Sequence, residues 1–516
     1  MNAAGRPTGP NEDSPRGDEA VGHLQEPLEG TIALKNYIDG RWVQGQSREQ
    51  CEVRNPATQK TIALAQMSSA EDVNEAVAAA SRAFPEWSQM TPLARTRCLF
   101  ELRELLEQNF EDLSRVQTME HGKTIDESRG ETRRGIENIE VAAGMPSLMM
   151  GKSLEDVASG IDERVQNQPV GVFGCIAPYN FPFMVPLWYV PYALALGNTF
   201  VLKPSPRAPI SQVRLCELME EAGFPPGVFN LVHGGASTAE AMLDHPEIAG
   251  VSFVGSTPVA RHVYKKCGET GKRVIAQGGA KNFIVVMPDA NLDRTIPALL
   301  TSFFGNTGQR CLAGANAVVV GKDRGFYKEL VSSFAEAAGA LRLGYGLDES
   351  VQMGPLQAED RKEVVLKYIE TGLAEGGKLR CDGRAPSVVG DYPENCFIGA
   401  SVFEGVRPDM RIAREEIFGP VASVMQVDDL AGALEVIDEN PFGNSASIFT
   451  CNGGIARRFR QAVSCGNVGI NIGIPAPMAF FPFGGMKDSF FGVLHGQGRD
   501  AIRFFCESKV VIERWF

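Results

Sequence analysis

Short runs of β-branched and other apolar residues alternate with segments of helical periodicity along most of this chain. Glycine turns and further helical segments separate the runs. Repetition of strand, glycine turn and helix is typical of a parallel sheet with helices on its faces. We therefore predict an α/β fold, with strands in VGVFGCIAP, TFVLKPS, VFNLVHG, IAGVSFVGS, RVIAQ, NFIVVMP and NAVVVG.

Two segments ahead of these strands have the periodicity of amphipathic helices. The first, SAEDVNEAVAAASRAF, begins at Ser69, whose side chain we expect to cap the helix. The second is ARTRCLFELRELLEQNFEDLSRV. No internal repeat of solenoid length is found, so the chain is not expected to form a repeat array.

Length and charge limit the classes of function. A chain of 516 residues is long enough for two or three domains, and a net charge of −13 disfavours nucleic acid or an anionic membrane as the main partner. It does not exclude a local basic pocket for a small anion. Eleven cysteines with no CxxC pair predict reduced thiols, with neither a disulfide framework nor a metal site.

The N-terminal residues 1–31 are polar and rich in glycine, proline and acidic residues, so we predict a disordered tail. The tail has neither an apolar signal core nor the composition of an organelle presequence, and we expect a cytoplasmic protein. An uncharged stretch between Arg164 and Lys203 is long enough for a membrane span, but Pro182, Pro186 and Pro191 interrupt it. We predict a buried helix followed by a buried strand, and no membrane partner.

Cys311, in the stretch FGNTGQRCLAG, is a candidate nucleophile without a neighbouring histidine. If its thiolate is favoured by positive charge, Arg310 is a candidate activator. Gly255 and Ser256 form a turn between a strand and a helix, and the start of such a helix suits a pyrophosphate. Taken alone these signals are weak, because glycine turns and buried structural thiols are common.

Five motifs in order change this interpretation: PYNFP, LKPS, FVGST, GQRC and EEIFGP. Together they resemble the aldehyde dehydrogenase superfamily, over nearly the whole chain after about residue 32. The resemblance implies an aldehyde dehydrogenase-like fold with a Rossmann-type cofactor domain, an α/β catalytic domain and an oligomerisation arm. We expect the cofactor domain in 32–145 and 169–279, the catalytic domain in 280–479, and the oligomerisation segments in 146–168 and 480–516.

The resemblance also implies roles for individual residues. Cys311 would be the nucleophile, and Asn180 would join the Cys311 backbone N–H as the oxyanion hole, which suits the alkoxide formed when a thiolate adds to an aldehyde. A nicotinamide cofactor, NAD, would then accept hydride, and the bound cofactor is, together with Arg310, a candidate activator of the thiol. The residues implied to bind it are Pro178, Tyr179, Lys203, Ser205, Gly255, Ser256, Glu416 and Phe418.

Gln277 stands where hydrolytic members of the superfamily carry the glutamate that activates water. A neutral amide cannot accept that proton, whereas a thiol can attack a thioester with less help. The methylmalonate-semialdehyde dehydrogenase branch also lacks the glutamate and passes its acyl group to coenzyme A. It resembles this chain in the GAKN…VVMPDAN segment, Ala280 to Asn291, and in the C-terminal FFPFGGMKDSFFGVLHGQG run.

The branch acts on semialdehydes that carry a carboxylate, for which the resemblance assigns Arg134 and Arg310 as anchors. Arg134 lies in a charged run, where an arginine is usually solvated and paired along its helix. Pro206 replaces an acid that often contacts the adenosine ribose, so NADP is expected to be tolerated beside NAD. The alternatives are a hydrolytic aldehyde dehydrogenase and a non-catalytic relative. The physiological semialdehyde, its pathway (valine, inositol or β-alanine breakdown) and a homodimer or homotetramer stay open.

Overall fold

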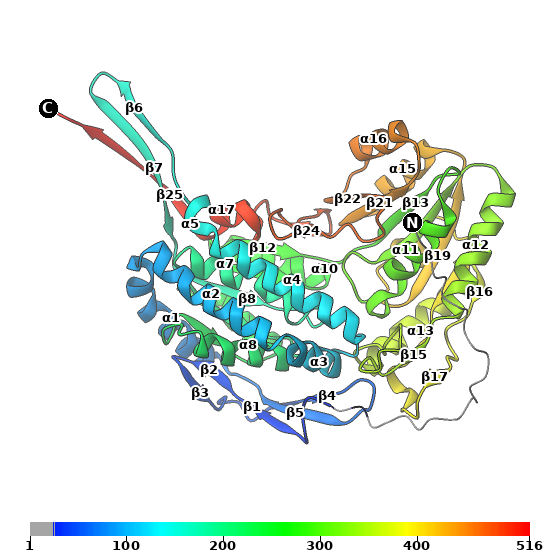
Figure 1. Ribbon diagram of the computed structural model, residues 1–516, viewed down its shortest axis with the longest axis horizontal. Coiled ribbons are helices and arrows are strands. Elements are labelled where there is room, and N and C mark those ends of the chain that lie inside the picture. The colour runs from blue at the N-terminus through cyan, green and yellow to red at the C-terminus, as the bar shows by residue number, and fades with distance from the viewer. Residues whose placement is uncertain (1–23, 25) are drawn as a thin grey trace, which may run out of the picture.

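The computed structural model describes residue 24 and residues 26–516 and arranges them in two α/β bodies with a projecting arm (Figure 1). Residues 1–23 and 25 of the predicted disordered tail 1–31 lie outside the described residues, whereas residues 24 and 26–31 are described and include Glu26, which makes hydrogen bonds given below. The chain passes from the first body to the second, and its C-terminal segment then returns to the first body.

The first body is built on an eight-stranded sheet with the strand order β24-β12-β11-β8-β9-β10-β2-β3. The five central strands are parallel, and antiparallel strands stand at both edges. The strands are β2 (Asn36–Ile38), β3 (Arg41–Val43), β8 (Val172–Ile176), β9 (Thr199–Lys203), β10 (Phe229–Leu231), β11 (Ile248–Val254), β12 (Arg273–Gln277) and β24 (Phe490–Phe491). The strands predicted in this part of the sequence are confirmed.

Alternate residues of these strands point to opposite faces, and each face has its own apolar core. Phe200 and Leu202 pack in one core, and Val201 packs in the other. The helices that contribute to the first core are α2 (Pro92–Gln108), α4 (Ile125–Ala143), α7 (Val190–Ala195) and α8 (Ile210–Glu221); those that contribute to the second are α1 (Ala70–Gln89), α9 (Ala236–Asp244) and α10 (Thr257–Glu269). The sheet is therefore covered on both sides, as parallel sheets require.

The second body is built on a seven-stranded sheet with the order β16-β18-β19-β14-β13-β21-β22. Its strands are β13 (Asn282–Val286), β14 (Gly314–Val320), β16 (Lys378–Cys381), β18 (Ser401–Glu404), β19 (Val421–Val427), β21 (Ser445–Phe449) and β22 (Asn467–Ile470). Helices α11 (Leu292–Phe304) and α12 (Arg324–Gly339) cover one face, and α13 (Glu359–Ala374), α15 (Leu430–Glu439) and α16 (Gly453–Ala462) cover the other.

Shorter elements complete the two bodies. They are β1 (Ile32–Leu34), β4 (Gln50–Arg54), β5 (Thr61–Gln66), α3 (Phe110–His121), α5 (Met145–Leu148), α6 (Met184–Leu187), β15 (Leu343–Gly344), β17 (Val388–Val389), α14 (Arg411–Arg414), β20 (Phe442–Gly443), β23 (Met486–Lys487) and α17 (Ala501–Phe505). The 3₁₀ turns are η1 (Gly305–Gly308), η2 (Glu394–Cys396) and η3 (Gly498–Asp500).

Local signals in the sequence explain where several helices begin and end. Ser69 accepts a hydrogen bond from the Asp72 backbone N–H, and the Asp72 side chain accepts one in return from Ser69, which forms a capping box and confirms the predicted cap. Two segments predicted to be helical are divided in the structure. The segment ARTRCLFELRELLEQNFEDLSRV forms α2 and α3, which are separated at Asn109. The predicted buried helix before β9 forms the short helices α6 and α7, because its prolines stop a continuous one.

The uncharged stretch between Arg164 and Lys203 was the one candidate that the sequence offered for a membrane span. Among residue 24 and residues 26–516, no helix combines the length and the apolar character that a membrane crossing needs. The stretch is instead buried in the first core, where Tyr189, Tyr192 and Phe200 are almost completely covered.

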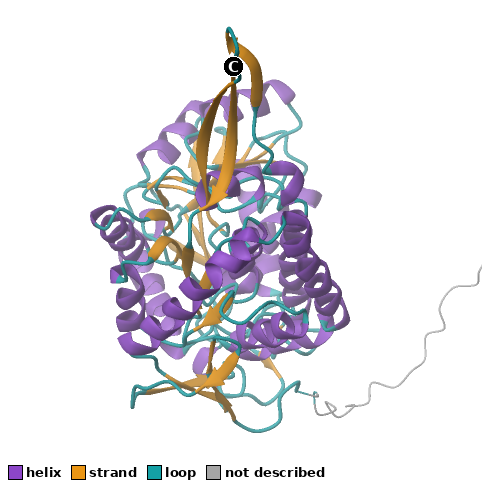
Figure 2. Cartoon of the chain, turned by 90° about the vertical axis from the view of Figure 1, so that its left-hand side faces the viewer, coloured by secondary structure: helices purple, strands orange, loops and turns teal. Residues whose placement is uncertain are grey.

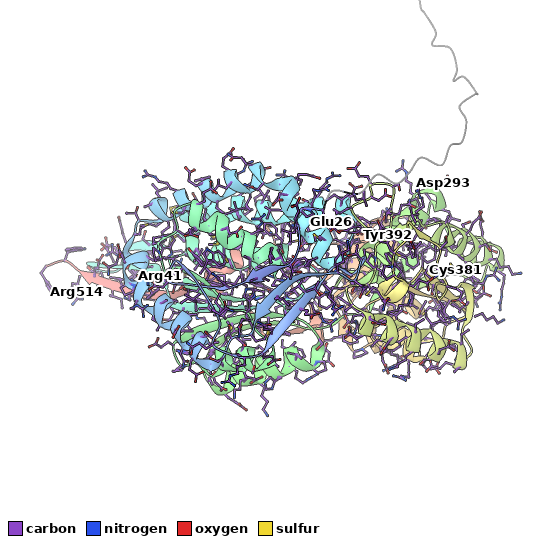
Figure 3. All side chains as sticks on the ribbon, turned by 90° about the horizontal axis from the view of Figure 1, so that it is seen from below. Glu26, Arg41, Asp293, Cys381, Tyr392 and Arg514 are labelled. Carbon is purple, nitrogen blue, oxygen red and sulfur yellow. The ribbon has the colours of Figure 1, made fainter. Side chains whose placement is uncertain are left out.

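The two bodies also meet through a polar cluster at the start of the described chain. The Tyr345 hydroxyl donates to the Glu26 carboxylate at 3.0 Å and accepts from the Asn55 side chain at 2.8 Å. Figure 3 shows Glu26 and Tyr392 close together at the seam between the bodies. Tyr392 packs edge-on against Tyr345. These contacts fix the seam along which the two bodies face each other.

The arm is a three-stranded antiparallel sheet with the order β25-β7-β6, made of β6 (Ser153–Ala158), β7 (Ile161–Pro169) and β25 (Cys506–Arg514). Figure 2 shows it standing away from the rest of the chain, with the C-terminus near its tip. Val510, Ile512 and Trp515 are each more than half exposed there. In contrast, β24 pairs with β12 in the first body, so residues 480–516 are divided between the arm and the body.

Arg273 links the body to the base of the arm. Its guanidinium donates to the backbone carbonyls of Arg503, Phe504 and Cys506, at 2.8 to 3.3 Å. These carbonyls lie at the end of α17 and the start of β25, where the helix leaves acceptors without intrahelical partners. The side chain therefore holds the turn from which the arm projects.

Replacement of Arg273 by Met should loosen the arm without unfolding the body. Removal of hydrogen bonds from a charged donor costs about 2 kcal/mol, so amide protons of residues 501–514 should exchange at least tenfold faster. Hydrogen–deuterium exchange with mass spectrometry measures this change, and peptides from β8 and β9 serve as the internal control. Unchanged exchange at the arm would show that the strand pairing with β7 is sufficient by itself.

Candidate functional site

Cys311 lies in the loop between η1 and β14, at the edge of the second sheet that faces the first body. Its backbone carbonyl accepts hydrogen bonds from the side chains of Asn282 and Asn444, at 2.8 and 2.7 Å. Both asparagines stand at the starts of neighbouring strands, β13 and β21. The position of the thiol is therefore set by the sheet rather than by the loop alone.

Two cavities meet at Cys311, which lines both of them. We name them by their position relative to the thiol. The first, of about 390 Å³, is the α10-side cavity, and it is lined by Pro178, Tyr179, Asn180, Ser205, Arg207, Phe253, Val254, Gly255, Ser256, Val259, Gly278, Cys311, Asp360, Arg361, Glu416 and Phe418. Eight of the residues predicted to act in catalysis or cofactor binding, besides Cys311, line this cavity.

The α10-side cavity has features that suit a dinucleotide. Helix α10 begins there. The side chain of its N-cap residue, Ser256, makes no hydrogen bond to the first turn, so the free backbone N–H groups of that turn face the cavity. A Cβ atom on Gly279 would collide with the Glu416 carboxylate, and one on Gly278 would lie 2.9 Å from the Thr257 hydroxyl. The two glycines therefore allow the chain to pack closely against Thr257 and Glu416 beside the cavity. The residues present therefore fit a pyrophosphate group at the start of α10.

The second cavity, of about 420 Å³, is the α4-side cavity. Helix α4 lines it with Glu127, Glu131, Arg134 and Asn138, whose spacing places them on one face of the helix. Arg310 and Cys311 close the end near the thiol, and apolar side chains such as Trp188 and Phe483 form much of the remaining wall. Such a cavity suits a small molecule with an apolar part and one charged group.

Arg134 and Arg310 reach the α4-side cavity from different elements. Arg134 forms an ion pair with Glu137 at 3.1 Å and contacts the Met478 sulfur, and about a third of its side chain is exposed. It thus makes the helix-surface pair expected from its charged run and also lines the cavity. Arg310 is mostly buried and forms an ion pair with Glu127 at 2.9 Å.

The ion pair between Glu127 and Arg310 was not predicted from the sequence. The Glu127 carboxylate also accepts from the Asn306 backbone N–H and from the Thr124 backbone N–H, where it completes the capping box of α4. Because Glu127 already balances the charge of Arg310, Arg310 affects the neighbouring thiol only weakly. A carboxylate that entered the cavity would share Arg310 with Glu127.

Asn180 is held from both ends. Its side-chain amide donates to the Gln309 carbonyl at 3.0 Å, and its own backbone carbonyl accepts from the Lys123 ammonium at 2.7 Å. Lys123 in turn forms a fully buried ion pair with Glu131 at 2.5 Å. The amide keeps a second N–H that is not used by Gln309, which leaves Asn180 a donor beside Cys311.

The Cys311 thiol is protonated in the protein without a ligand. Burial raises its pKa to about 12, and the nearby Glu416 carboxylate acts in the same direction. The positive charge of Arg310 opposes these effects but is outweighed. Of the two expected activators, Arg310 and the bound cofactor, Arg310 does not outweigh burial and Glu416, and activation by the cofactor stays a prediction.

Glu416 and Lys281 lie behind Cys311. Burial raises the pKa of Glu416 to about 7, and burial lowers the pKa of Lys281 to about 7, while the opposite charge of each partly offsets the effect on the other. The Glu416 carboxylate accepts from the Ala280 backbone N–H at 2.8 Å. A carboxyl group with such a pKa can hold or release a proton near neutral pH.

Lys203 is the one predicted site residue that lines neither cavity. Its ammonium donates to the backbone carbonyls of Pro204 and Gly234, at 2.8 and 2.9 Å, and burial lowers its pKa to about 8. Its predicted contact with an adenosine ribose stays a prediction. Arg207, which the sequence did not single out, lines the α10-side cavity and pairs with Asp360 through two contacts of 2.9 and 2.6 Å.

Gln277 ends strand β12 and is buried. Its amide nitrogen donates to the Tyr189 hydroxyl at 3.0 Å. No acidic side chain stands at this position, so the described site has no carboxylate where a hydrolytic enzyme of the resembled superfamily would hold its base. Within residue 24 and residues 26–516 there is also no group of three or more His, Cys, Asp or Glu side chains arranged to bind a metal ion.

The comparisons with known proteins identify the family. A family model described as the aldehyde dehydrogenase family matches residues 42–511. The chain belongs to the aldehyde dehydrogenase family. The expected fold class is thereby confirmed. Membership of this family also supports the prediction of an enzyme over that of a non-catalytic structural or binding protein.

Individual relatives cover almost the same length. The enzyme is similar to malonate-semialdehyde dehydrogenase 2 of Geobacillus kaustophilus (strain HTA426), with 46% identity over 486 residues, which are 94% of this chain and 99% of the relative. The crystal structure of a methylmalonate-semialdehyde dehydrogenase from Oceanimonas doudoroffii superposes with a TM-score of 0.91 at 41% identity, over 94% of this chain and 98% of that one. A Bacillus cereus aldehyde dehydrogenase in complex with NAD⁺ has a TM-score of 0.88 at 31% identity, over 93% and 96% of the two chains.

Alkylation of Cys311 should depend strongly on pH. With a pKa of about 12, the thiolate fraction rises tenfold for each pH unit, so the rate with iodoacetamide should rise about 100-fold from pH 7 to pH 9. Addition of NAD should raise the rate at pH 7, because the positive nicotinamide ring favours the thiolate. Mass spectrometry of the Cys311 peptide gives the rate, with the exposed Cys451 as internal reference. A rate without NAD that levels off below pH 9 would contradict this account.

Proposed function

We propose that the enzyme oxidises malonate or methylmalonate semialdehyde, with NAD as hydride acceptor and coenzyme A as acyl acceptor, through a thioester on Cys311. The thioester would lose its carboxylate as carbon dioxide, with a proton taken up at the carbon that carried it, so that transfer to coenzyme A would give acetyl-CoA or propanoyl-CoA together with carbon dioxide and NADH. One observation carries the proposal: Cys311 forms the wall between a cavity that suits a dinucleotide and a cavity that holds two arginines. The names of the relatives from Geobacillus and Oceanimonas point in the same direction.

The α4-side cavity would hold the semialdehyde. Its carboxylate would pair with Arg134 and Arg310, which brings the aldehyde carbon to the Cys311 sulfur at the opposite end of a small molecule. The apolar wall formed by Trp188 and Phe483 would accept the short carbon chain. An aldehyde without a carboxylate would fit the same cavity but lose the contacts with the arginines.

The residues around the thiol would then carry the first chemical step. The thiolate of Cys311 attacks the carbonyl carbon, and the free N–H of Asn180 with the Cys311 backbone N–H would stabilise the resulting oxyanion. The Lys123–Glu131 ion pair fixes Asn180 for this task. NAD, when bound in the α10-side cavity against Ser256, Glu416 and Phe418, supplies the hydride acceptor that oxidises the adduct to the thioester.

Release of the acyl group favours a thiol over water. Gln277 is neutral and donates to Tyr189, so it cannot take a proton from water. Coenzyme A is a better nucleophile than water near neutral pH and would displace the Cys311 sulfur from the thioester. The proton of the coenzyme A thiol would pass to Cys311, which restores the resting enzyme.

The projecting arm suggests a homo-oligomer, because its three-stranded sheet exposes apolar side chains along β25. A second copy of the chain would cover them. Dimer and tetramer are both compatible with this arm. NADP stays a proposed alternative cofactor, since Pro206 supplies no acid near the ribose end of the cavity.

Replacement of Arg134 by Met should affect carboxylated substrates selectively. Loss of a charged hydrogen-bond donor costs about 1.5 to 3 kcal/mol, so the KM for malonate semialdehyde should rise tenfold or more, while that for propanal changes less than about twofold. Steady-state NADH formation measures both constants. Arg133→Met is a matched control, because Arg133 is on the same helix but pairs with Glu107 outside the cavity. Equal effects on the two substrates would remove Arg134 as an anchor.

Replacement of Gln277 by Glu should create a base for water. General bases contribute about 10²- to 10⁴-fold, so steady NADH formation without coenzyme A should rise at least tenfold at pH 8. Gln277→Met, which also breaks the hydrogen bond to Tyr189 but adds no base, should keep the low rate. If the Glu variant shows no gain, the missing carboxylate is not the reason for a requirement for coenzyme A.

A further inference from the structure

Gln309 stands two residues before Cys311 and is completely buried. It belongs to the GQRC motif, but the sequence assigned it no role. Gln309 lines neither the α10-side cavity nor the α4-side cavity, so its side chain does not reach a molecule bound in either of them. Any part that it takes in the reaction must therefore pass through its contacts with other residues.

The backbone carbonyl of Gln309 orients the side chain of Asn180. This carbonyl accepts hydrogen bonds from the side-chain amides of Asn180 at 3.0 Å and of Asn306 at 3.1 Å. A carbonyl oxygen has two lone pairs, and both are used here. Because an amide group is planar, fixing one N–H of Asn180 on this carbonyl also fixes the direction of its second N–H. The position of the Gln309 carbonyl thus determines where the proposed oxyanion donor points.

The side chain of Gln309 holds that carbonyl in place. Its Oε1 accepts from the Gln357 backbone N–H at 3.2 Å, and its Nε2 donates to the Asn306 backbone carbonyl at 3.3 Å. A backbone N–H can only donate, so the contact with Gln357 determines which end of the Gln309 amide carries the oxygen. Both contacts are buried, where an unpaired polar group is costly. The side chain therefore restrains the segment from Asn306 to Gln309 against the second body.

Gln357 extends this connection to the first body. It lies just before α13, and its Nε2 donates to the Arg207 backbone carbonyl at 3.0 Å. Arg207 follows strand β9, and Asn180 follows strand β8, which pairs with β9 in parallel. The carboxyl ends of two neighbouring strands are thus held by Gln357 and Gln309, which bond each other.

The backbone ahead of Gln309 needs this restraint. Asn306 and Thr307 have φ angles of 54° and 53°, in the left-handed region that a β-branched threonine rarely adopts. Such a conformation persists only where the surrounding contacts enforce it. The Thr307 hydroxyl supplies one contact, to the Gly354 carbonyl at 2.8 Å, and the Gln309 side chain supplies the others described above. Loss of the Gln309 amide would let the segment relax and turn the carbonyl that holds Asn180.

We propose that Gln309 is a positioning residue for the oxyanion donor. Its side chain, bonded to Gln357, fixes the carbonyl that directs the free N–H of Asn180 toward the adduct on Cys311. Gln309 touches neither the aldehyde nor the cofactor, and it acts on the reaction only through Asn180. This inference rests on the oxyanion role of Asn180 in the proposed function.

Replacement of Gln309 by Met keeps the length of the side chain and removes both of its hydrogen bonds. The measured quantity is the rate constant of the NADH burst after rapid mixing of the full enzyme and saturating NAD with malonate semialdehyde, without coenzyme A. Loss of an oxyanion donor costs about 10²- to 10³-fold, so a misdirected donor should slow the burst at least about tenfold. The half-saturating aldehyde concentration should change less than about twofold, because the arginines that hold the carboxylate are untouched.

A second variant, Gln309→Glu, keeps an oxygen that can accept from the Gln357 N–H. It should be slowed less than Gln309→Met. Equal slowing of the two variants would show that the contact with Gln357 is not what holds the carbonyl.

A double-mutant cycle tests whether Gln309 acts through Asn180. Asn180→Ala removes the donor itself and should slow the burst about 10²-fold or more. In the Asn180→Ala enzyme, the added Gln309→Met change should slow the burst by less than about twofold, since the amide that it orients is already gone. A further loss as large as that in the wild-type background would show that Gln309 acts by another route.

Alkylation of Cys311 by iodoacetamide distinguishes a misdirected donor from a displaced thiol. This reaction builds no oxyanion, and the Cys311 carbonyl is held independently by Asn282 and Asn444. The alkylation rate of Gln309→Met at pH 8 without NAD should therefore equal that of the wild-type enzyme. A change in this rate as large as the change in the burst would mean that the thiol has moved, and it would overturn the proposal.

Gln426→Met is the matched control for the loss of a glutamine in the second body. Gln426 lies near the end of β19 that is remote from Phe418, and its Nε2 donates to the Gly321 carbonyl at 2.7 Å. This variant should keep the wild-type rates of both the burst and the alkylation. Slowing of the burst by this variant to the extent seen in Gln309→Met would show a general effect of lost hydrogen bonds and would contradict the proposal.

The outcomes separate this inference from the proposed function. If Asn180→Ala keeps the wild-type burst, the proposed oxyanion role of Asn180 fails and the role of Gln309 falls with it. If Asn180→Ala slows the burst but Gln309→Met does not, only the role of Gln309 is overturned. If the wild-type enzyme gives no burst with malonate semialdehyde, the proposed substrate fails, and the same variants measured with propanal still decide whether Gln309 positions Asn180.

Discussion

The buried ion pair between Lys123 and Glu131 is the contact on which the geometry of the site depends. Both side chains are fully covered, and the ammonium and carboxylate lie 2.5 Å apart. Burial of two charges is costly unless each has further hydrogen bonds. Here Lys123 also donates to the Asn180 carbonyl, and Glu131 accepts from the backbone N–H groups of Phe183 and Met184. The pair thereby ties α4 to the turn that carries Asn180.

Other residues on the same face of helix α4 also hold parts of the site in place. Glu127 holds Arg310 and the backbone of Asn306, Glu131 holds the Asn180 turn, and Arg134 reaches the same cavity one turn later. The second sheet supplies the other half of the site through Asn282 and Asn444, which hold the Cys311 carbonyl. The thiol therefore stands between elements from both bodies. A change in how the bodies meet would move the nucleophile relative to its oxyanion donor.

The sequence predicted those parts of the structure that depend on local patterns. Strands such as Thr199–Lys203 follow from short apolar runs, and the Ser69 cap follows from the residue type and its spacing to Asp72. The ordered motifs predicted that Asn180, Gly255 and Cys311 belong to one site, because a resemblance over the whole chain implies the fold as well. All three residues line the α10-side cavity. Local patterns were less reliable for helices, since Asn109 and the prolines before β9 divided segments that had the periodicity of one helix.

Other contacts between distant residues were not predicted. The partners of Lys203 are backbone carbonyls, which no side-chain pattern reveals. The charge balance at Arg310 depends on Glu127, nearly two hundred residues away along the chain, and the high pKa of Cys311 depends on its burial and on Glu416. The functional signal of α4 was present in its acidic and basic residues at helical spacing. It was interpreted as a solvated face because only the fold shows which face is covered.

The central claim is that acyl transfer from Cys311 requires a thiol rather than water. The most direct test is rapid-mixing measurement of NADH formation by the purified enzyme with malonate semialdehyde and NAD, recorded with and without coenzyme A. The account predicts one burst of about one NADH per site without coenzyme A, followed by steady turnover only when coenzyme A is added. Steady turnover in water at the same rate as with coenzyme A would contradict the account and would require a base other than Gln277.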